Sequence, residues 1–178
     1  MERVFLDTNL QYPISIADLL LRLGDVALHE IVWSEQRLAE TEQVLVEVKG
    51  LAQPQAAYFC DCIREEFPNG QVRIGEYRHL VDQMTGPDAD DHQHAAAARA
   101  AATVLLTFNV DDFLATDLGT VRIMTPDAYL IEVLIEQPET VMTIIAEMGA
   151  GRRQPQPVAS TLDALDRAGS TRSFRRPI

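Results

Sequence analysis

The sequence lacks the features that mark membrane, secreted and nucleotide-binding proteins. No apolar run approaches the roughly 18 residues of a membrane span, and the N-terminus has no apolar signal segment. Cysteine occurs only at Cys60 and Cys62. On a helix this C-x-C spacing points the two side chains apart, which suits neither a disulfide nor a shared metal. P-loop, dinucleotide-binding, hydrolase-elbow and zinc-protease motifs are absent. We therefore expect a soluble, cytoplasmic protein with two ordinary helical cysteines.

Positive charge is scarce in most of the chain. The 178 residues carry a net charge of −12, with 15 Lys and Arg against 27 Asp and Glu. The first 151 residues contain 9 basic and 25 acidic side chains, whereas the last 27 contain six arginines and two aspartates. An acidic body repels free nucleic acid unless cations bridge the two. The composition argues against a generic nucleic-acid binder and suits a protein that gathers divalent metal or meets a basic partner.

Strand and helix patterns alternate along the chain. The 178-residue chain is long enough to form one globular domain without disulfides, and 47% of its residues are hydrophobic, as in globular proteins. Alternating strands and helices form a mostly parallel sheet with helices on both faces. The sequence thus predicts a three-layer α/β/α fold with about five strands. The strands are expected at 4–6, 31–33, 72–74, 104–106 and 121–124, and the helices at 14–23, 35–48, 54–67, 91–102, 126–136 and 138–148, with 75–87 unassigned.

Acidic residues lie where the expected strands end and where one helix begins. Asp7 directly follows the first strand, and Asp112 lies shortly after the strand at 104–106. Asp90 and Asp91 open an alanine-rich helix. Because the carboxyl ends of parallel strands meet at one edge of the sheet, we expect these carboxylates to lie close together. Mg²⁺ and Mn²⁺ prefer such oxygen ligands, so the pattern favours a metal site.

Most of these acids also have an ordinary structural interpretation. An aspartate at a helix start is commonly a cap, which fits Asp88 or Asp90. Glu40 lies one turn after Arg37, and a surface ion pair of these two is the favoured interpretation from the residues alone. Asp7 differs, because a carboxylate that follows a buried strand costs several kcal/mol unless it is paired. A metal ion is a simple partner for it.

Two further kinds of site receive little support. His92 and His94 stand two residues apart on the expected helix, so they do not share a face and a joint zinc site is not expected. One of them could contact a substrate phosphate. Asp7 is also placed like the nucleophile of some phosphotransfer enzymes, but those usually have a second aspartate where this chain has Asn9.

Four short motifs occur in a fixed order between residues 3 and 136. They are Asp7-Thr8-Asn9, a glutamate within Ser34-x-x-x-Leu38-x-Glu40, Asp91 at the start of an alanine-rich helix, and Thr107-x-Asn109-x-x-Asp112-Phe113. Each motif alone is weak. Together, with Asp91 standing 16 residues before Thr107, they resemble the PIN-domain ribonucleases. The closest group is the VapC-type toxins of type II toxin–antitoxin pairs.

The resemblance implies a Mg²⁺- or Mn²⁺-dependent endoribonuclease with a PIN-like fold. Asp7 and Asp91 would be metal ligands, while Glu40 and Asp112 would be ligands or contact metal-bound water. Asp90 competes with Asp91, because adjacent acids leave the register open by one residue. Asn109 stands where many VapC toxins have a fourth aspartate, which leaves open whether one or two ions bind. The full implied site is Asp7, Glu40, Asp91 and Asp112, supported by Asn9, Thr107, Asn109 and Asp90.

The same resemblance implies partners and leaves two alternatives. It implies an RNA substrate, an antitoxin whose segment plugs the acidic groove, and a possible homodimer, with no membrane association. One alternative is a housekeeping RNA-processing nuclease without an antitoxin. The other is a metal-stabilised binding module, catalytically weak because Asn109 replaces an acid.

The end of the chain differs from the rest. We divide the chain into a PIN-like domain at 1–137 and a helical extension with a basic tail at 138–178. The tail is either a solvated terminus or a segment whose Arg172, Arg175 and Arg176 bind RNA phosphates.

Overall fold

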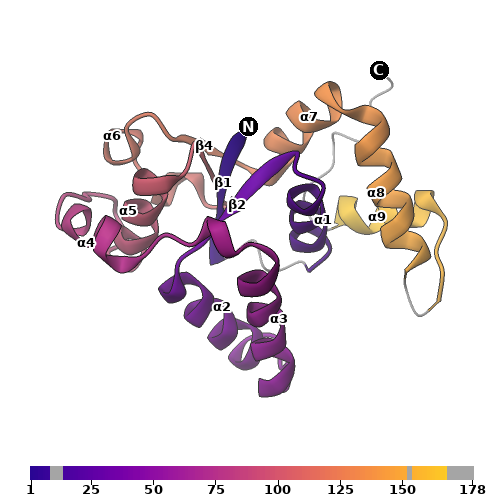
Figure 1. The fold of residues 1–178 in the computed structure, drawn as a ribbon, viewed down its shortest axis with the longest axis horizontal. Helices are drawn as coiled ribbons and strands as arrows, with labels where there is room; N and C mark the ends of the chain where they lie inside the picture. The colour runs from indigo at the N-terminus through magenta and orange to yellow at the C-terminus, as the bar shows by residue number, and fades with distance from the viewer. Residues whose placement is uncertain (9–13, 152–153, 168–178) are drawn as a thin grey trace.

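A computed structural model describes residues 1–8, 14–151 and 154–167 of the chain (Figure 1). Its centre is a sheet of four parallel strands in the order β2-β1-β3-β4. Because β1 lies between β2 and β3, the residue that follows β1 emerges in the middle of the carboxyl edge. The strands are β1 (Glu2–Leu6), β2 (His29–Val32), β3 (Val104–Leu106) and β4 (Arg122–Met124).

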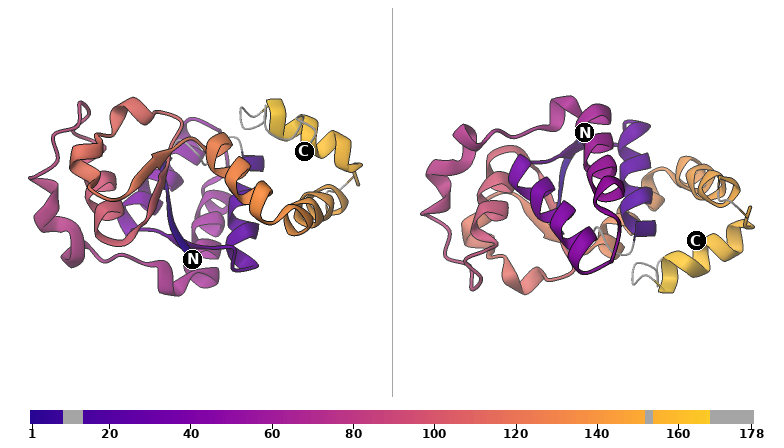
Figure 2. Two further views of the ribbon diagram at one scale, coloured as in Figure 1. Left: turned by 90° about the horizontal axis from the view of Figure 1, so that it is seen from above. Right: turned by 90° about the horizontal axis from the view of Figure 1, so that it is seen from below.

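Helices cover both faces of the sheet, as Figures 1 and 2 show. One face packs against α4 (Ile74–Val81), α5 (His92–Ala101) and α6 (Ala115–Leu118). The helices that contribute to the core at the other face are α1 (Ile14–Asp25), α2 (Glu35–Glu47), α3 (Gln53–Glu66), α7 (Pro126–Glu136), α8 (Pro138–Ala150) and α9 (Val158–Arg167). This α/β architecture with a parallel sheet confirms that part of the sequence prediction.

Side chains of the strands alternate between two hydrophobic clusters. In β1, Val4 and Leu6 join the cluster beside α1, whereas Phe5 joins the cluster beside α5. In β3, Leu105 alternates with its two neighbours in the same way. Successive strand residues point to opposite faces, and here both faces are covered. The two central strands therefore end in uninterrupted apolar runs, Val4 to Leu6 and Val104 to Leu106, and the polar residue after each run lies at the sheet's edge.

The strand expected at 72–74 is absent from the described sheet. The backbone N–H of Val72 donates to the carbonyl oxygen of Trp33 (2.8 Å), but the contact stops at one isolated bridge. The chain then turns into α4, because the Glu76 carboxylate accepts the backbone N–H of Arg73 (2.7 Å) and so starts the helix. Gly70 permits the close approach before this turn, since a Cβ there would lie 1.8 Å from the carbonyl oxygen of Ile31. The helix α4 occupies most of the stretch left unassigned.

Alanine brings α5 close to the sheet. Ala95 to Ala98 are all buried in the cluster formed by Phe5 and Leu105. Small side chains let a helix axis approach a sheet closely. Since α5 precedes β3 and runs back along the sheet, its first turn lies at the carboxyl edge, beside the end of β1.

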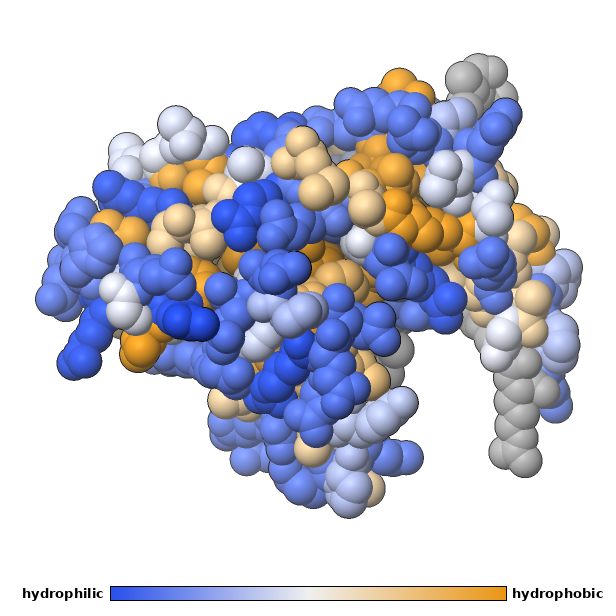
Figure 3. Space-filling model, viewed as in Figure 1, coloured by the Kyte–Doolittle hydropathy of each residue, from blue (hydrophilic) through white to orange (hydrophobic). Residues whose placement is uncertain are grey.

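The helices after residue 137 belong to the main hydrophobic core. Ile144 and Ile145 of α8 and Leu165 of α9 are buried in the same cluster as α1. Exposed apolar residues on this side include Ile131 and Ile135 of α7, and Figure 3 shows apolar surface near α7 and α8. None of the described helices combines the length and apolar character that a bilayer crossing requires. The arginines of the basic tail at 172, 175 and 176 lie outside the described residues.

Candidate metal centre

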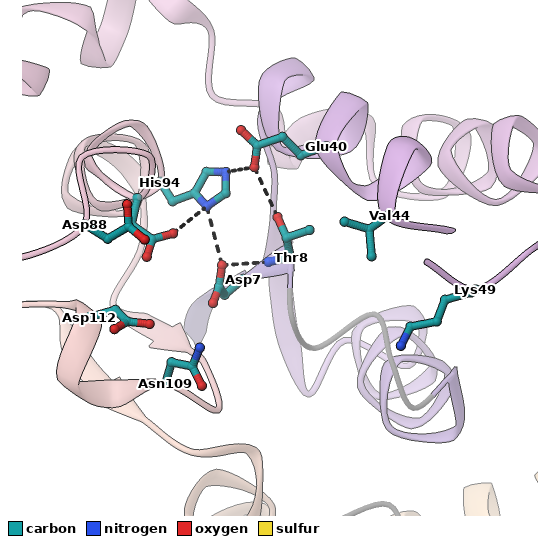
Figure 4. Close-up of a pocket in the computed structure, with 10 residues that line it drawn as sticks. Asp7, Thr8, Glu40, Val44, Lys49, Asp88, His94, Asn109 and Asp112 are labelled. Carbon is teal, nitrogen blue, oxygen red and sulfur yellow. Dashed lines mark hydrogen bonds and ion pairs between the residues drawn. The ribbon is translucent and has the colours of Figure 1, made fainter. Parts of the chain in front are cut away.

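A pocket of about 440 Å³ opens at the carboxyl edge of the sheet (Figure 4). Its walls come from the end of β1, the middle of α2, the start of α5 and the turn after β3, which are distant in sequence. The fold therefore brings together the strand-end acids of the sequence prediction. The titratable and amide side chains that line the pocket include Asp7, Glu40, Asp88, Asp91, His94, Asn109 and Asp112.

Asp7 forms the buried base of this pocket, with only 4% of the residue exposed. Its Oδ2 accepts the hydroxyl of Thr107 (2.8 Å), and its Oδ1 accepts the backbone N–H of Thr8 (2.7 Å). Burial by itself raises the pKa of a carboxyl group, but contacts with His94 and Thr107 and the charges of His94 and Arg37 outweigh it. The pKa of Asp7 therefore lies below its usual value, and Asp7 is a carboxylate at neutral pH.

Arg37 fixes the end of β1 from behind Asp7. This fully buried side chain donates through Nε to the carbonyl oxygen of Leu6, and through Nη2 to that of Asp7 (3.1 Å). Its Nη1 donates to Thr41 (2.7 Å). Burial lowers the pKa of Arg37 to about 10, which leaves the guanidinium charged at neutral pH. The surface Arg37–Glu40 pair of the sequence interpretation is thus wrong, because Arg37 lies on the buried face of α2.

His94 is the member of the site that sequence reasoning missed. It is 2% exposed, and its Nε2 lies 2.7 Å from Oε2 of Glu40. Its Nδ1 lies 3.4 Å from Oδ1 of Asp7 and 3.8 Å from Oδ1 of Asp91. Burial lowers the pKa of a histidine, but here Asp7 and Glu40 raise the pKa of His94 to about 9. His94 and Asp91 are three residues apart, so one helix face carries both.

The structure separates Asp91 from Asp90. Asp91 lines the pocket, and its pKa is raised to about 6, first by burial and then by the charge of Asp7. Asp90 is exposed and lines a neighbouring hollow against α2. Of these two competing acids, Asp91 is the one that lies beside Asp7 and His94.

The remaining predicted residues take different positions. Asp112 and Asn109 line the pocket wall after β3, and the backbone N–H of Asn109 donates to the hydroxyl of Thr107 (3.0 Å). Glu40 lies across the pocket, in weak contact with the hydroxyl of Thr8 (3.4 Å). Asn9, the predicted support for Asp7, lies outside the described residues.

Asp117, a carboxylate outside the pocket, positions the loop that carries Asp88 and Asp91. Its Oδ2 accepts the backbone N–H groups of Thr85 (2.5 Å) and Gly86 (2.9 Å), and its Oδ1 accepts the Thr85 hydroxyl (2.8 Å). His92 donates from Nε2 to the carbonyl oxygen of Gly86 (2.9 Å). His92 therefore anchors this loop, apart from the site that contains His94.

The cluster at the base of the pocket can hold a metal ion. Asp7, Asp91 and His94 each offer one ligand atom, and these atoms lie within 4.8 Å of one another. Both ring nitrogens of His94 are buried, and within the described part of the chain neither has a partner in hydrogen-bond geometry. Nε2 is nevertheless close enough to Glu40 for an ion pair. Buried nitrogens and carboxylates that converge in this way form a donor set for a cation.

Comparisons of the chain with family models, curated proteins and solved structures found no match. The functional argument therefore rests on the geometry of this pocket and on the chemistry of its side chains.

Proposed function

We propose that the protein is a metal-dependent endoribonuclease that hydrolyses RNA phosphodiester bonds in the pocket at the carboxyl edge. The observation that carries the proposal is the convergence of Asp7, Glu40, Asp91 and Asp112 from four separate segments on one pocket. An acidic cluster of this kind opposes an RNA phosphate by itself, so the proposal requires a bound cation.

The chemistry of phosphodiester hydrolysis fits this donor set. A divalent ion supplies an activated water and neutralises charge that develops on the phosphate. Asp7, fixed by Thr107 and Thr8, presents an ionised oxygen at the base of the pocket. Asp91 and Asp112 line the walls, where they can orient water or bind the ion. Mg²⁺ and Mn²⁺ are the ions of choice for carboxylate-rich sites of this type.

Lys49 adds a substrate-binding element that sequence reasoning missed. It lines the same pocket, and Figure 4 shows it across the pocket from His94. A lysine at the rim can attract an RNA phosphate while the carboxylates at the base bind the metal. In this proposal the pocket therefore contacts the substrate through Lys49 and carries out the chemistry around Asp7.

Cleavage of structured RNA tests the proposal. Purified protein should cut tRNA or ribosomal RNA fragments in Mg²⁺ or Mn²⁺ and lose this activity in EDTA. Asp7→Asn should lower the rate at least about 100-fold, beyond the 10–100-fold typical of residues that only support a metal ligand. Asp111→Asn is the matched control, because Asp111 is exposed and lies beside the site without lining it. Equal cleavage by wild type and Asp7→Asn would contradict the proposal.

The resemblance to VapC-type toxins extends the proposal to a biological role. We propose that the nuclease acts as a toxin and that an antitoxin segment with a basic side chain enters the acidic pocket. Charge complementarity favours such an inhibitor. Expression should then arrest bacterial growth, and Asp7→Asn should abolish the arrest. An RNA-cleaving protein that leaves growth unaffected would instead favour the housekeeping nuclease.

A further inference from the structure

We infer that His94 is a metal ligand through Nδ1, that Glu40 orients it, and that the pocket consequently selects a divalent transition-metal ion over Mg²⁺. This inference rests on the metal-dependent function proposed above and specifies its cofactor. It changes the role of Glu40 from a metal ligand to a residue that positions one.

The orientation of the imidazole ring is the first argument. Figure 4 shows His94 between Glu40 and Asp7, with one ring nitrogen toward each. Nδ1 faces the space between the carboxylates of Asp7 and Asp91, whereas Nε2 faces Glu40. Nδ1 is therefore the nitrogen that an ion would bind, in exchange for its proton, and Nε2 is the nitrogen that would keep its proton toward Glu40.

The distances around Nδ1 fit a shared ion. Two ligands that each lie about 2.0–2.2 Å from one ion are about 2.8–3.1 Å apart at octahedral angles and about 3.3–3.6 Å apart at tetrahedral angles. The separation of Nδ1 from Oδ1 of Asp7 is 3.4 Å, which already satisfies this condition. The separation from Oδ1 of Asp91 is 3.8 Å, and a small rotation of this half-buried side chain closes it.

The contact between Glu40 and Nε2 is the second argument. Histidines that bind metals almost always donate their other ring N–H to a carboxylate, a carbonyl or water, which fixes the tautomer and raises the basicity of the ligand. Oε2 of Glu40 lies 2.7 Å from Nε2 and can take this position. A contact from Glu40 to His94, and from His94 to the ion, then explains why the side chain of Glu40, in the middle of α2, points toward the pocket.

Ligand chemistry determines the preferred ion. Carboxylate and water oxygens suit Mg²⁺, whereas imidazole nitrogen suits first-row transition metals. A site with two carboxylates and one imidazole therefore gains affinity for Mn²⁺ and the later transition metals that it does not gain for Mg²⁺. Asp7 and Asp91 alone would not produce this preference.

Calorimetric titration with Mn²⁺ and with Mg²⁺, in the absence of RNA, tests the inference. Wild type should bind Mn²⁺ more tightly than Mg²⁺, and His94→Asn should reduce that ratio by about tenfold or more, mainly through weaker Mn²⁺ binding. His79→Asn is the matched control, because His79 is exposed on α4 and should leave both affinities unchanged. An unchanged ratio in folded His94→Asn would overturn the inference.

A second measurement uses the wild-type chain and does not depend on how the variant folds. In long-range ¹H–¹⁵N spectra, stoichiometric Zn²⁺ should shift the Nδ1 signal of the His94 ring and leave His79 unchanged. No shift of any of the four histidine rings would overturn the inference. Selective Mn²⁺ binding without RNA cleavage would retain the metal site and reject the nuclease. RNA cleavage that uses both ions equally and is unaffected by His94→Asn would retain the nuclease and reject His94 as a metal ligand.

Discussion

Two histidines at opposite edges of the sheet are almost equally buried, but at neutral pH one is uncharged and the other is protonated. His29 begins β2 at the amino edge and is 1% exposed, while His94 lies at the carboxyl edge and is 2% exposed. Burial lowers the pKa of His29 to about 4, whereas the pKa of His94 is raised to about 9. The difference lies in their partners. His29 contacts the carbonyl oxygen of Leu20 and the hydroxyl of Tyr129, each at 2.9 Å, whereas carboxylates surround His94.

The comparison shows how one fold keeps a buried histidine neutral at one edge and a buried histidine charged at the other. At the amino edge, a neutral His29 satisfies both ring nitrogens, because Nε2 donates to Leu20 and Nδ1 accepts from Tyr129. At the carboxyl edge, Arg37 and His94 offset the charge of Asp7 within the protein. A pocket whose carboxylates already hold buried cations is suited to bind a metal ion, which would replace the proton on Nδ1 of His94.

Removing Arg37 should produce the largest loss of stability. Arg37→Met takes away a buried cation and leaves the carbonyl oxygens of Leu6 and Asp7 without these donors. We expect a loss of about 3–5 kcal/mol in the free energy of unfolding, measured by urea denaturation.

Arg122 provides the matched comparison at the amino edge. It forms ion pairs with Glu2 and Glu132, but its side chain is 43% exposed. Arg122→Met should therefore cost less than about 1 kcal/mol, since exposed pairs contribute little. Equal losses in the two variants would contradict the claim that the carboxyl edge depends on buried charge.

Acid should destabilise the amino edge through His29. The unfolded chain has a histidine pKa near 6.5, and the folded value is about 4, so the unfolded state takes up the proton first. The contribution of a neutral His29 is present above pH 6.5 and is lost as the pH falls toward 4. The loss is about 3 kcal/mol.

Urea unfolding at pH 7 and pH 4 measures this acid effect. His29→Gln should be less stable than wild type at pH 7 but should lose about 3 kcal/mol less between the two pH values, because glutamine does not titrate. His79→Gln should behave like wild type, since His79 is exposed. The same acid loss in His29→Gln and wild type would show that His29 is not the group that titrates.

The sequence predicts most of the fold because burial on both faces leaves a strong apolar pattern. Val4 to Leu6 and Val104 to Leu106 form uninterrupted apolar runs, and each has a polar residue directly after it. The expected strand at 72–74 failed for a local reason. Val72 is apolar and buried, yet a helix begins just after it, because Glu76 accepts the backbone N–H of Arg73. An apolar strand pattern carries no information about a single capping contact of this kind.

The candidate site was only partly predictable from the sequence. Strand ends locate Asp7 and the acids after β3, since topology alone places them at one edge. The spacing of His94 from His92, two residues away, indicates no shared site, whereas its spacing from Asp91, three residues away, places both on one helix face. That Asp-x-x-His spacing is the signal that was available. For Arg37 and Asp117, no local pattern indicates which carbonyl or loop they bind, because those partners are distant in sequence.

Anomalous diffraction from crystals grown with Mn²⁺ would test the central claim most directly. We predict a manganese peak at the base of the pocket, about 2.0–2.2 Å from a carboxylate oxygen of Asp7, a carboxylate oxygen of Asp91 and Nδ1 of His94. Glu40 should remain in contact with Nε2. A pocket without manganese at a saturating concentration, or an ion bound only by exposed acids elsewhere, would contradict the account.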